Sequence, residues 1–187
     1  MQIRKARSTD GAAIAPLIAG IYRDMEMPAL ADVSDQDLLD MLTHLYARPE
    51  YLDDLAQTFV ADDAGQVVGV AFGHPAENEE AVNDLLMQVS QAHAGFSVPL
   101  ELGGETQPGE WYLSMLAVDP QHQDHGIGSQ LLGALPQLVG DLAAKLSLNV
   151  DDGNPRAAKL YHRQGFARNG RLMIGVHPYQ HMVKPIA

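Results

Sequence analysis

The chain alternates between short apolar runs, which are typical of strands, and stretches with apolar residues at helical spacing. Residues that favour turns bound most of the short runs, so we expect strands there. The predicted strands cover residues 2–6, 58–61, 66–73, 111–118, 146–150, 166 onward and 180–184. The second and third flank Asp62-Asp63-Ala64-Gly65, a sequence that favours a hairpin, and we expect them to pair antiparallel.

Helical spacing predicts two helices before this hairpin. The first follows the capping residues Ser8-Thr9-Asp10, although Pro16 would either kink it or delay its start. Its apolar positions are Ile14, Leu17, Ile18, Ile21 and Met25. The second follows the Ser-x-x-acid capping pattern of residues 34–37. Its inner face would carry Leu38, Leu39, Leu42 and Leu45.

Between the third and fourth strands lies a long segment of different character, at about residues 75–109. It contains an acidic stretch whose apolar residues predict a helix, namely Val82, Leu85, Leu86 and Val89. Gly103-Gly104 and Pro108-Gly109 predict loops after that helix. A connection this long is uncommon unless it contacts a ligand or another subunit, so we interpret it as a functional insertion.

The fourth strand leads into a glycine-containing turn and another predicted helix. Asp119-Pro120 ends the strand, and residues 123–128 follow the pattern Gln-x-x-Gly-x-Gly. The apolar positions of the helix are Leu131, Leu132, Leu135, Leu138, Val139 and Leu142. The first turn of a helix presents unpaired N–H groups, so residues 126–129 could bind a phosphate or pyrophosphate. Two glycines before a helix are also found in ordinary tight turns, so this motif alone does not establish a ligand.

Composition limits the classes of protein. With 187 residues and 46% hydrophobic content, the chain suits a single domain over residues 1–187. The net charge of −12 argues against a nucleic-acid partner, and the absence of cysteine excludes disulfides and a cysteine nucleophile. No apolar run approaches membrane-spanning length and the first residues lack a signal peptide, so we expect a cytoplasmic protein with no membrane partner.

Two motifs in order along the chain now carry a family resemblance. The first is Leu-Ala-Val-Asp-Pro at 116–120, followed by Gln-Asp-His-Gly-Ile-Gly at 123–128. The second is Asn154-Pro-Arg-Ala-Ala-Lys-Leu-Tyr161-His-Arg-Gln-Gly-Phe166, with Asn154 as helix N-cap and Pro155 at the first helical position. Together they resemble the GNAT superfamily of acyl-CoA-dependent N-acyltransferases. The resemblance implies an α/β fold with a mixed sheet of about seven strands, flanking helices and a helical insertion between strands 3 and 4.

The resemblance also implies a co-substrate, acetyl-CoA, and the residues that bind it. Backbone groups of the fourth strand would pair with the pantetheine arm, and the glycine loop would bind the pyrophosphate. The implied binding residues are Leu116, Ala117, Val118, Gln123, Asp124, His125, Gly126, Ile127, Gly128, Ser129, Asn154 and Lys159. Relatives often have arginine at the position of Gln123 and glycine at that of Asp124, so this loop carries less positive charge. Lys159 and Arg163 would compensate, unless they belong to a solvated helix face.

The implied reaction is direct attack of a primary amine on the thioester in a ternary complex. Tyr161 would protonate the departing thiolate, and a backbone N–H near Leu116 or Ala117 would stabilise the oxyanion. The sequence leaves the general base open. Candidates are Glu101, Glu105, Glu110, or a water held by Ser114 or Asn149.

We expect no metal, because neither His122 with His125 nor His177 with His181 has a convincing third ligand. The acceptor is a small-molecule or peptide amine that the sequence does not identify, and the insertion is compatible with a homodimer. Two alternatives stay open at this point. One is an acyl-CoA-binding regulatory or structural module with little transferase activity, and the other is a nucleotide-binding protein that uses Gly126 and Gly128, although it lacks a phosphate-loop Lys-Ser/Thr ending.

Overall fold

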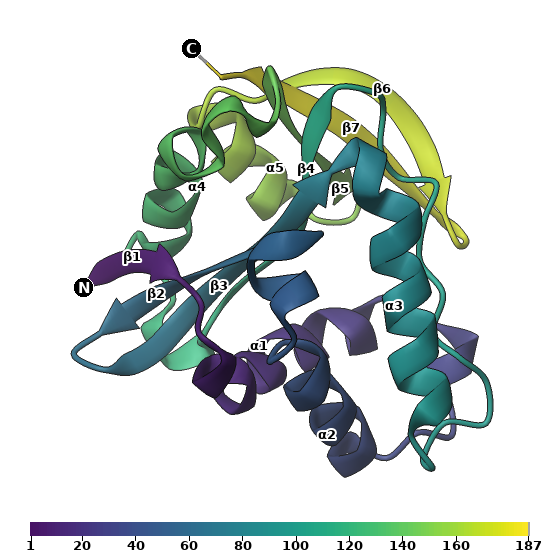
Figure 1. Ribbon diagram of the computed structural model, residues 1–187. Helices are drawn as coiled ribbons and strands as arrows, with labels where there is room; N and C mark the ends of the chain where they lie inside the picture. The colour runs from purple at the N-terminus through teal and green to yellow at the C-terminus, as the bar shows by residue number, and fades with distance from the viewer. Residues whose placement is uncertain (187) are drawn as a thin grey trace.

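In the computed structural model, which describes residues 1–186, seven strands form one mixed sheet with helices on both faces (Figure 1). The strands are β1 (Gln2–Lys5), β2 (Gln57–Asp63), β3 (Gln66–Pro75), β4 (Glu110–Val118), β5 (Lys145–Asp151), β6 (Ala167–Ile174) and β7 (His177–Pro185). Their order across the sheet is β1-β2-β3-β4-β5-β7-β6. This architecture confirms the predicted mixed sheet of about seven strands.

All neighbouring strands pair antiparallel except β4 and β5, which run parallel. A parallel pair needs a crossover, and the helix that follows β4 supplies it. The hairpin predicted at residues 62–65 is confirmed, since β2 and β3 pair from Gln57 opposite Gly73 to Asp63 opposite Gln66. The one parallel pair therefore lies at the centre of the sheet.

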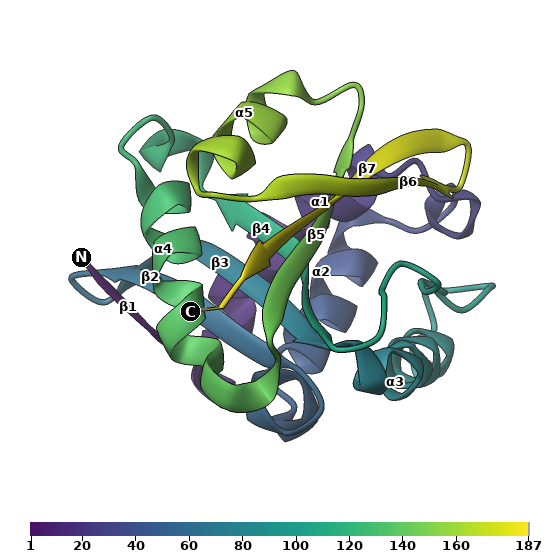
Figure 2. The same ribbon diagram turned by 90° about the horizontal axis from the view of Figure 1, so that it is seen from above.

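Five α-helices flank this sheet within residues 1–186: α1 (Gly11–Asp24), α2 (Asp35–Leu45), α3 (Glu79–Ala92), α4 (Ile127–Val139) and α5 (Pro155–Arg163). Short 3-10 turns lie at Ser8–Asp10, Pro28–Leu30, Ala76–Asn78, Pro120–His122 and Gly140–Leu142, and a π-helical turn lies at Glu50–Asp54. In Figure 2, α4 and α3 lie at opposite ends of the molecule. None of these helices is long and apolar enough to cross a membrane.

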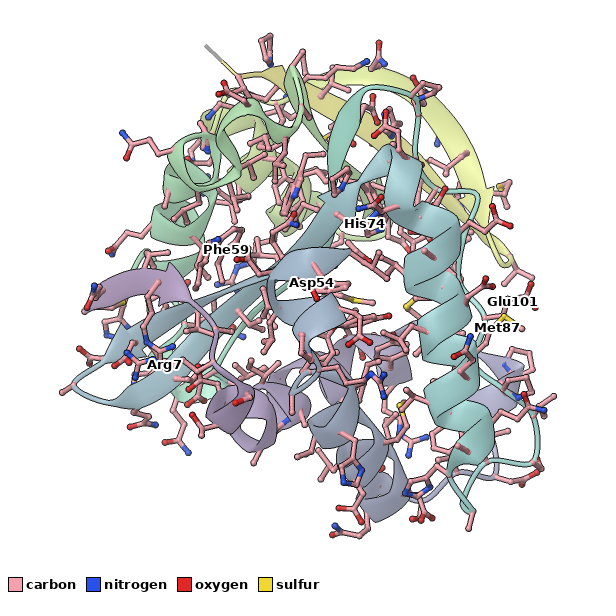
Figure 3. All side chains as sticks on the ribbon, in the orientation of Figure 1. Arg7, Asp54, Phe59, His74, Met87 and Glu101 are labelled. Carbon is pink, nitrogen blue, oxygen red and sulfur yellow. The ribbon has the colours of Figure 1, made fainter. Side chains whose placement is uncertain are left out.

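The sheet separates two apolar layers. Side chains alternate between its faces, so Phe59 (labelled in Figure 3) and Ala61 pack in the layer of α4. Val60 packs in the layer of α1 and α2. Trp111 is fully buried on the α4 side, and its indole N–H donates a 2.6 Å hydrogen bond to Gln57 Oε1. This bond satisfies the indole donor inside the core.

The predicted helix starts are confirmed in part. The Ser34 side chain caps α2 by accepting a hydrogen bond from the Asp37 N–H. Asp10 instead accepts hydrogen bonds from the Arg7 N–H and the Arg4 guanidinium, so it ties the start of α1 to β1. Pro16 does not delay the helix, because α1 already begins at Gly11 and contains the proline.

One predicted helix is too long. The apolar spacing extended the helix after the glycine loop to Leu142, but α4 ends at Val139 and Leu142 is 50% exposed. Gly140 has a φ of +57°, a left-handed conformation that ends the helix before Leu142 can reach the buried face.

The segment at 75–109 contains the predicted helix, α3, followed by a loop that folds back on it. Ser90 Oγ accepts a hydrogen bond from the Leu100 N–H, and the Glu79 carboxylate accepts one from the Glu105 N–H and another from the Thr106 hydroxyl. These bonds hold the loop against α3.

Gly73 supports a close contact between β3 and β4, and its substitution tests this packing. A Cβ at Gly73 would collide with the Tyr112 carbonyl oxygen and the Trp111 indole. We expect Gly73→Ala to lower the free energy of unfolding by about 1–3 kcal/mol because of this overpacking. The measurement is chemical denaturation. Gly20→Ala is the matched control, since no heavy atom lies within 4 Å of its added Cβ, and it should stabilise α1 by about 0.5–1 kcal/mol.

Candidate functional site

Strands β4 and β5 diverge in the middle of the sheet. They pair only from Glu110 opposite Lys145 to Leu113 opposite Leu148, whereas β4 continues to Val118 and β5 to Asp151. Beyond Leu113, β4 remains paired to β3 on its other side. Alternate N–H and C=O groups of residues 114–118 therefore face an opening between the strands, where an amide-bearing ligand can pair with them.

The glycine loop forms the start of α4 at one end of this opening. Gly126 is the N-cap residue with a φ of +77°, which favours glycine at this position. Gly126 has no side chain to cap the helix, so the N–H groups of Ile127, Gly128 and Ser129 are available to an anion. Asp124 also adopts a left-handed conformation, with a φ of +64°.

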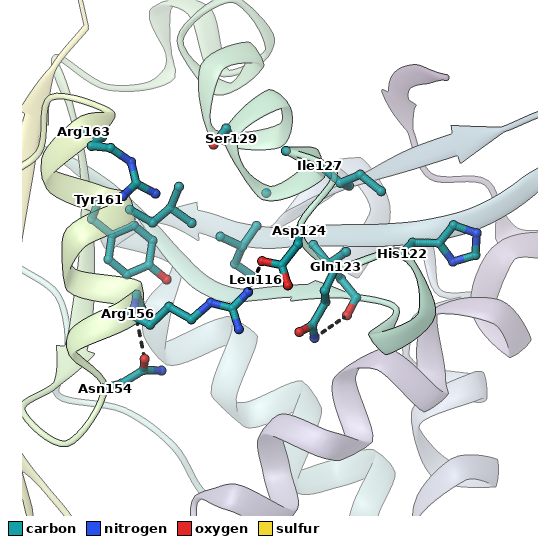
Figure 4. A pocket seen from close by; sticks show the side chains of 15 residues that line it. Leu116, His122, Gln123, Asp124, Ile127, Ser129, Asn154, Arg156, Tyr161 and Arg163 are labelled. Carbon is teal, nitrogen blue, oxygen red and sulfur yellow. Dashed lines mark hydrogen bonds and ion pairs between the residues drawn. The ribbon is translucent and has the colours of Figure 1, made fainter.

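A cavity of about 490 Å³ lies between this loop and α5 (Figure 4). We call it the glycine-loop cavity. It is lined by Leu116, Val118, His122, Gln123, Asp124, Gly126, Ile127, Gly128, Ser129, Asn154, Arg156, Ala157, Leu160, Tyr161 and Arg163. Nine of the twelve residues implied as cofactor-binding by the resemblance are in this set, whereas Ala117, His125 and Lys159 are not.

The charges around the glycine-loop cavity differ from those expected from the sequence. Asp124 Oδ1 accepts a 2.5 Å hydrogen bond from Arg156, and both side chains are largely exposed at the cavity mouth (Figure 4). Arg163 also lines the cavity, whereas Lys159 is exposed on α5. The arginines of α5 rather than Lys159 therefore carry the positive charge here. Arg156 was not singled out from the sequence, although it follows the helix-capping Asn154-Pro155 pair directly.

The local sequence fixes the start and end of α5. Asn154 Oδ1 accepts a 3.0 Å hydrogen bond from the Ala157 N–H, and Pro155 occupies the first helical position, as predicted. Gly165, with a φ of +89°, ends the helix. This short helix places Tyr161 against Phe166, with ring centroids 6.1 Å apart. Burial raises the pKa of Tyr161 to about 12, so its hydroxyl keeps its proton at neutral pH.

A second cavity of about 570 Å³ adjoins the first. We call it the carboxylate cavity, because Asp24, Glu105 and Asp151 are among the residues that line it. Other parts of its wall come from α1, β4, β5 and the β6–β7 hairpin. The two cavities share Leu116, Asn154, Ala157 and Tyr161. Tyr161 and Leu116 thus stand at the junction of the two spaces.

Of the three carboxylates considered as general base, only Glu105 lines the carboxylate cavity. It accepts a 2.5 Å hydrogen bond from the Tyr112 hydroxyl. Burial raises the pKa of Glu105, which outweighs the lowering effect of the Tyr112 bond. Glu110 is fully buried beside Lys145 and His181, and Glu101 is exposed on the outer side of its segment (Figure 3). Ser114 and Asn149 also line the cavity.

The histidines considered as metal ligands have other partners. His122 Nδ1 lies 2.9 Å from Asp119, His125 Nδ1 lies 2.7 Å from the Gln123 carbonyl, and His181 contacts Asn149 and Glu110. His177 lies near Glu26 and Asp151. Within residues 1–186, no three His, Asp or Glu side chains are grouped in a way that could hold a metal ion.

Comparisons with known proteins identify the family and agree with the fold. Residues 21–166 match the sequence model of the Acetyltransferase (GNAT) family. The crystal structure of an acetyltransferase superposes with a TM-score of 0.85 at 39% identity, covering 100% of both chains. The mycothiol acetyltransferase of Kineococcus radiotolerans is 30% identical over 86% of this chain. The spermine/spermidine N(1)-acetyltransferase of Bacillus subtilis is 31% identical over 38% of it. The matches span 56% and 49% of the lengths of these two curated relatives.

Proposed function

Because the chain belongs to the Acetyltransferase (GNAT) family, we propose that it transfers an acetyl group from acetyl-CoA to the primary amine of a small molecule. The observation that carries this proposal is the junction of the two cavities at Leu116 and Tyr161. One cavity suits a pyrophosphate-bearing ligand, and the other is lined by carboxylates. A thioester at the junction would face an amine arriving from the carboxylate cavity.

The residues around the glycine-loop cavity fit coenzyme A. The free edge at residues 114–118 would pair with the pantetheine amides, and the first N–H groups of α4 would bind the pyrophosphate. Arg156 and Arg163 would add positive charge from α5. We infer that the backbone of the loop carries most of the phosphate binding, since Gln123 is uncharged and Asp124 is already paired with Arg156.

Acetyl-CoA supplies an activated acetyl group as a thioester, and the residues at the junction would manage the protons. Glu105 would accept a proton from the ammonium form of the acceptor, directly or through water, which frees the nitrogen lone pair. As the nitrogen–carbon bond forms and the carbon–sulfur bond breaks, Tyr161 would donate its proton to the thiolate. The acetylated nitrogen would release its second proton, through water, and so restore the Tyr161 hydroxyl. A backbone N–H near Leu116 or Ala117 would stabilise the oxyanion. The chain has no cysteine to form a thioester intermediate, which favours direct transfer.

The acceptor class follows from the lining of the carboxylate cavity. Asp24, Glu105 and Asp151 favour a positively charged ligand. The cavity volume of about 570 Å³ suits a small molecule. The B. subtilis relative is named as an acetyltransferase of spermine and spermidine, which are small cationic amines. We therefore propose a small cationic amine as the acceptor.

The proposal is tested by incubating the protein with acetyl-CoA and a panel of amines, including polyamines, aminoglycosides and amino acids. We expect acetylated product by mass spectrometry and stoichiometric release of free CoA thiol. Thermal stabilisation by acetyl-CoA without product from any amine would overturn catalysis and favour an acyl-CoA-binding module. Competition of acetyl-CoA binding by ATP would instead favour a nucleotide site.

Asp124 should weaken the binding of coenzyme A. Its negative charge lies in the same cavity as the proposed pyrophosphate site and pairs with Arg156, which would otherwise be free to approach the phosphates. We expect Asp124→Asn to tighten CoA binding about threefold at low salt, an effect that salt should diminish. Asparagine tolerates the left-handed backbone at this position, so the charge alone is changed.

Isothermal titration calorimetry with CoA measures this effect. Asp40→Asn is the matched control, because Asp40 is an exposed residue of α2 on the other face of the sheet, and CoA affinity should not change. Weaker CoA binding by Asp124→Asn would mean that the ion pair with Arg156 organises the site rather than competing with the ligand.

A further inference from the structure

A buried polar cluster lies behind the carboxylate cavity. Glu110 is fully buried and His181 is 2% exposed. His181 Nε2 lies 3.2 Å from each oxygen of the Glu110 carboxylate, and Lys145 Nζ lies 3.2 Å from its Oε1. Burial alone would raise the pKa of Glu110, but the neighbouring Ser147, His181 and Lys145 side chains lower the pKa below its usual value. The Lys145 ammonium beside Oε1 and the Gln107 N–H that donates to Oε2 both favour the carboxylate anion, to which His181 Nε2 donates.

The second ring nitrogen of His181, Nδ1, is linked by hydrogen bonds to Glu105 in the carboxylate cavity. Asn149 on β5 stands directly opposite His181 on β7, and the Asn149 Oδ1 to His181 Nδ1 distance is 2.7 Å. The Asn149 amide nitrogen donates to the Glu105 carbonyl oxygen at 2.9 Å and to the Tyr112 hydroxyl at 3.2 Å. The Tyr112 hydroxyl then donates to the Glu105 carboxylate at 2.5 Å. These contacts connect His181 to Glu105 through two side chains.

The directions of these bonds determine the protonation of His181. A carbonyl oxygen only accepts, so the Asn149 amide must turn its nitrogen toward the Glu105 carbonyl and its oxygen toward His181. His181 Nδ1 must therefore donate to Asn149. Since Nε2 donates to the Glu110 anion, both ring nitrogens carry a proton. A neutral ring would leave either an acceptor facing Asn149 Oδ1 or an acceptor facing Glu110.

We propose that His181, held as an imidazolium by Glu110, is a positioning residue for Glu105 and favours its ionised form. Along the path from His181 through Asn149 and the Tyr112 hydroxyl, each hydrogen bond donates toward the Glu105 carboxylate, and aligned hydrogen bonds polarise one another. A carboxylate must be ionised to accept the proton of the acceptor amine, so the catalytic meaning of this link rests on the proposed function. The protonation of both His181 ring nitrogens does not depend on that function.

Other groups also act on Glu105 and would set its background titration. The charged or titratable side chains around it include Tyr112, Glu79, His74, Tyr22, Tyr179, Asp24, Asp151 and His177. Glu79 raises the pKa of Glu105, as burial does. The donor chain from His181 opposes both effects, because it supplies hydrogen bonds to the charged form.

The first test needs no variant and no activity. In protein labelled with ¹⁵N-histidine, the two ring nitrogens of His181 should both show protonated chemical shifts at about pH 7.5, where an ordinary histidine is neutral. His93, which is partly exposed after α3, provides the comparison, and through-bond correlations from backbone to ring assign the signals. A neutral ring with one unprotonated nitrogen would overturn the proposal.

The second test follows Glu105 itself by ¹³C NMR of labelled glutamate carboxyl groups, with Glu105→Gln for assignment. We expect His181→Gln to raise the midpoint of the Glu105 titration by about one pH unit, whereas His93→Gln should leave it unchanged. An unchanged midpoint in folded His181→Gln would overturn the proposal. If this variant does not fold, the wild-type nitrogen shifts still decide.

Kinetics then distinguish this proposal from the proposed function. Once an acceptor amine is identified, the midpoint of the acidic limb of the kcat/KM profile should shift to higher pH by about one pH unit in His181→Gln. The KM for acetyl-CoA should stay unchanged. A mere packing defect would lower activity equally at all pH values and contradict the link. If no amine is acetylated, the proposed function fails, while the two NMR results still support or refute the proton arrangement.

Discussion

Tyr161→Phe is expected to lower kcat by about 10²-fold, while the KM for acetyl-CoA stays within about twofold of the wild-type value. The hydroxyl is the proposed proton donor to the departing thiolate, and burial raises its pKa to about 12. The phenolic form therefore persists across the whole pH range in which the protein is assayed. Phenylalanine keeps the ring that packs on Phe166, so the variant removes only the proton donor.

Steady-state kinetics with the best acceptor amine measure this effect. Tyr46→Phe is the matched control, because the Tyr46 hydroxyl is buried in the layer on the α1 and α2 side and has no hydrogen-bond partner within residues 1–186. Its loss should leave kcat unchanged. A wild-type kcat for Tyr161→Phe would contradict the acid assignment.

Glu105→Gln is expected to lower kcat/KM by about 10²-fold at neutral pH. Glutamine still accepts the Tyr112 hydrogen bond through its amide oxygen, so the local fold should persist. It has no basic oxygen that could remove a proton from the acceptor ammonium. The effect should appear mainly in kcat/KM for the amine rather than in the affinity for acetyl-CoA.

The pH dependence of kcat/KM should also change in Glu105→Gln. Because burial raises the pKa of Glu105, the wild-type kcat/KM should rise with pH as this carboxyl group ionises, at a pH above that of an ordinary glutamate. The acidic limb should disappear in Glu105→Gln. Glu101→Gln is the control, since Glu101 is exposed nearby in the sequence, and its profile should match the wild type. A retained acidic limb in Glu105→Gln would assign the base elsewhere.

Local sequence signals predicted the backbone structure on the glycine-loop side of the site. The glycines before α4 and the Asn154-Pro155 start of α5 depend on neighbouring residues alone, and both appear where the sequence indicated. The helix boundary at Val139 was missed because the spacing of apolar residues continued to Leu142, although Gly140 already ends the helix. The spacing of apolar residues predicts which face of a helix is buried, but it does not predict where the helix ends.

The opposite half of the site could not be predicted in the same way. Glu105 lies in a loop without apolar periodicity, and hydrogen bonds from its backbone N–H to Glu79 and from Tyr112 to its carboxylate hold it in place. These contacts join residues that are 26 and 7 positions apart. Sequence alone therefore left Glu105 as one of several carboxylates. The pairing of Arg156 with Asp124, 32 residues away, is equally non-local.

The junction of the two cavities is the central element of this account, and a crystal structure with a non-reactive ketone analogue of acetyl-CoA tests it most directly. We expect the pantetheine amides to pair with the backbone of residues 114–118 and the pyrophosphate to contact the N–H groups of Ile127 to Ser129. The carbonyl of the analogue should face the carboxylate cavity, within hydrogen-bond reach of Tyr161. An analogue bound with its acyl group away from Tyr161 and Leu116 would contradict the account.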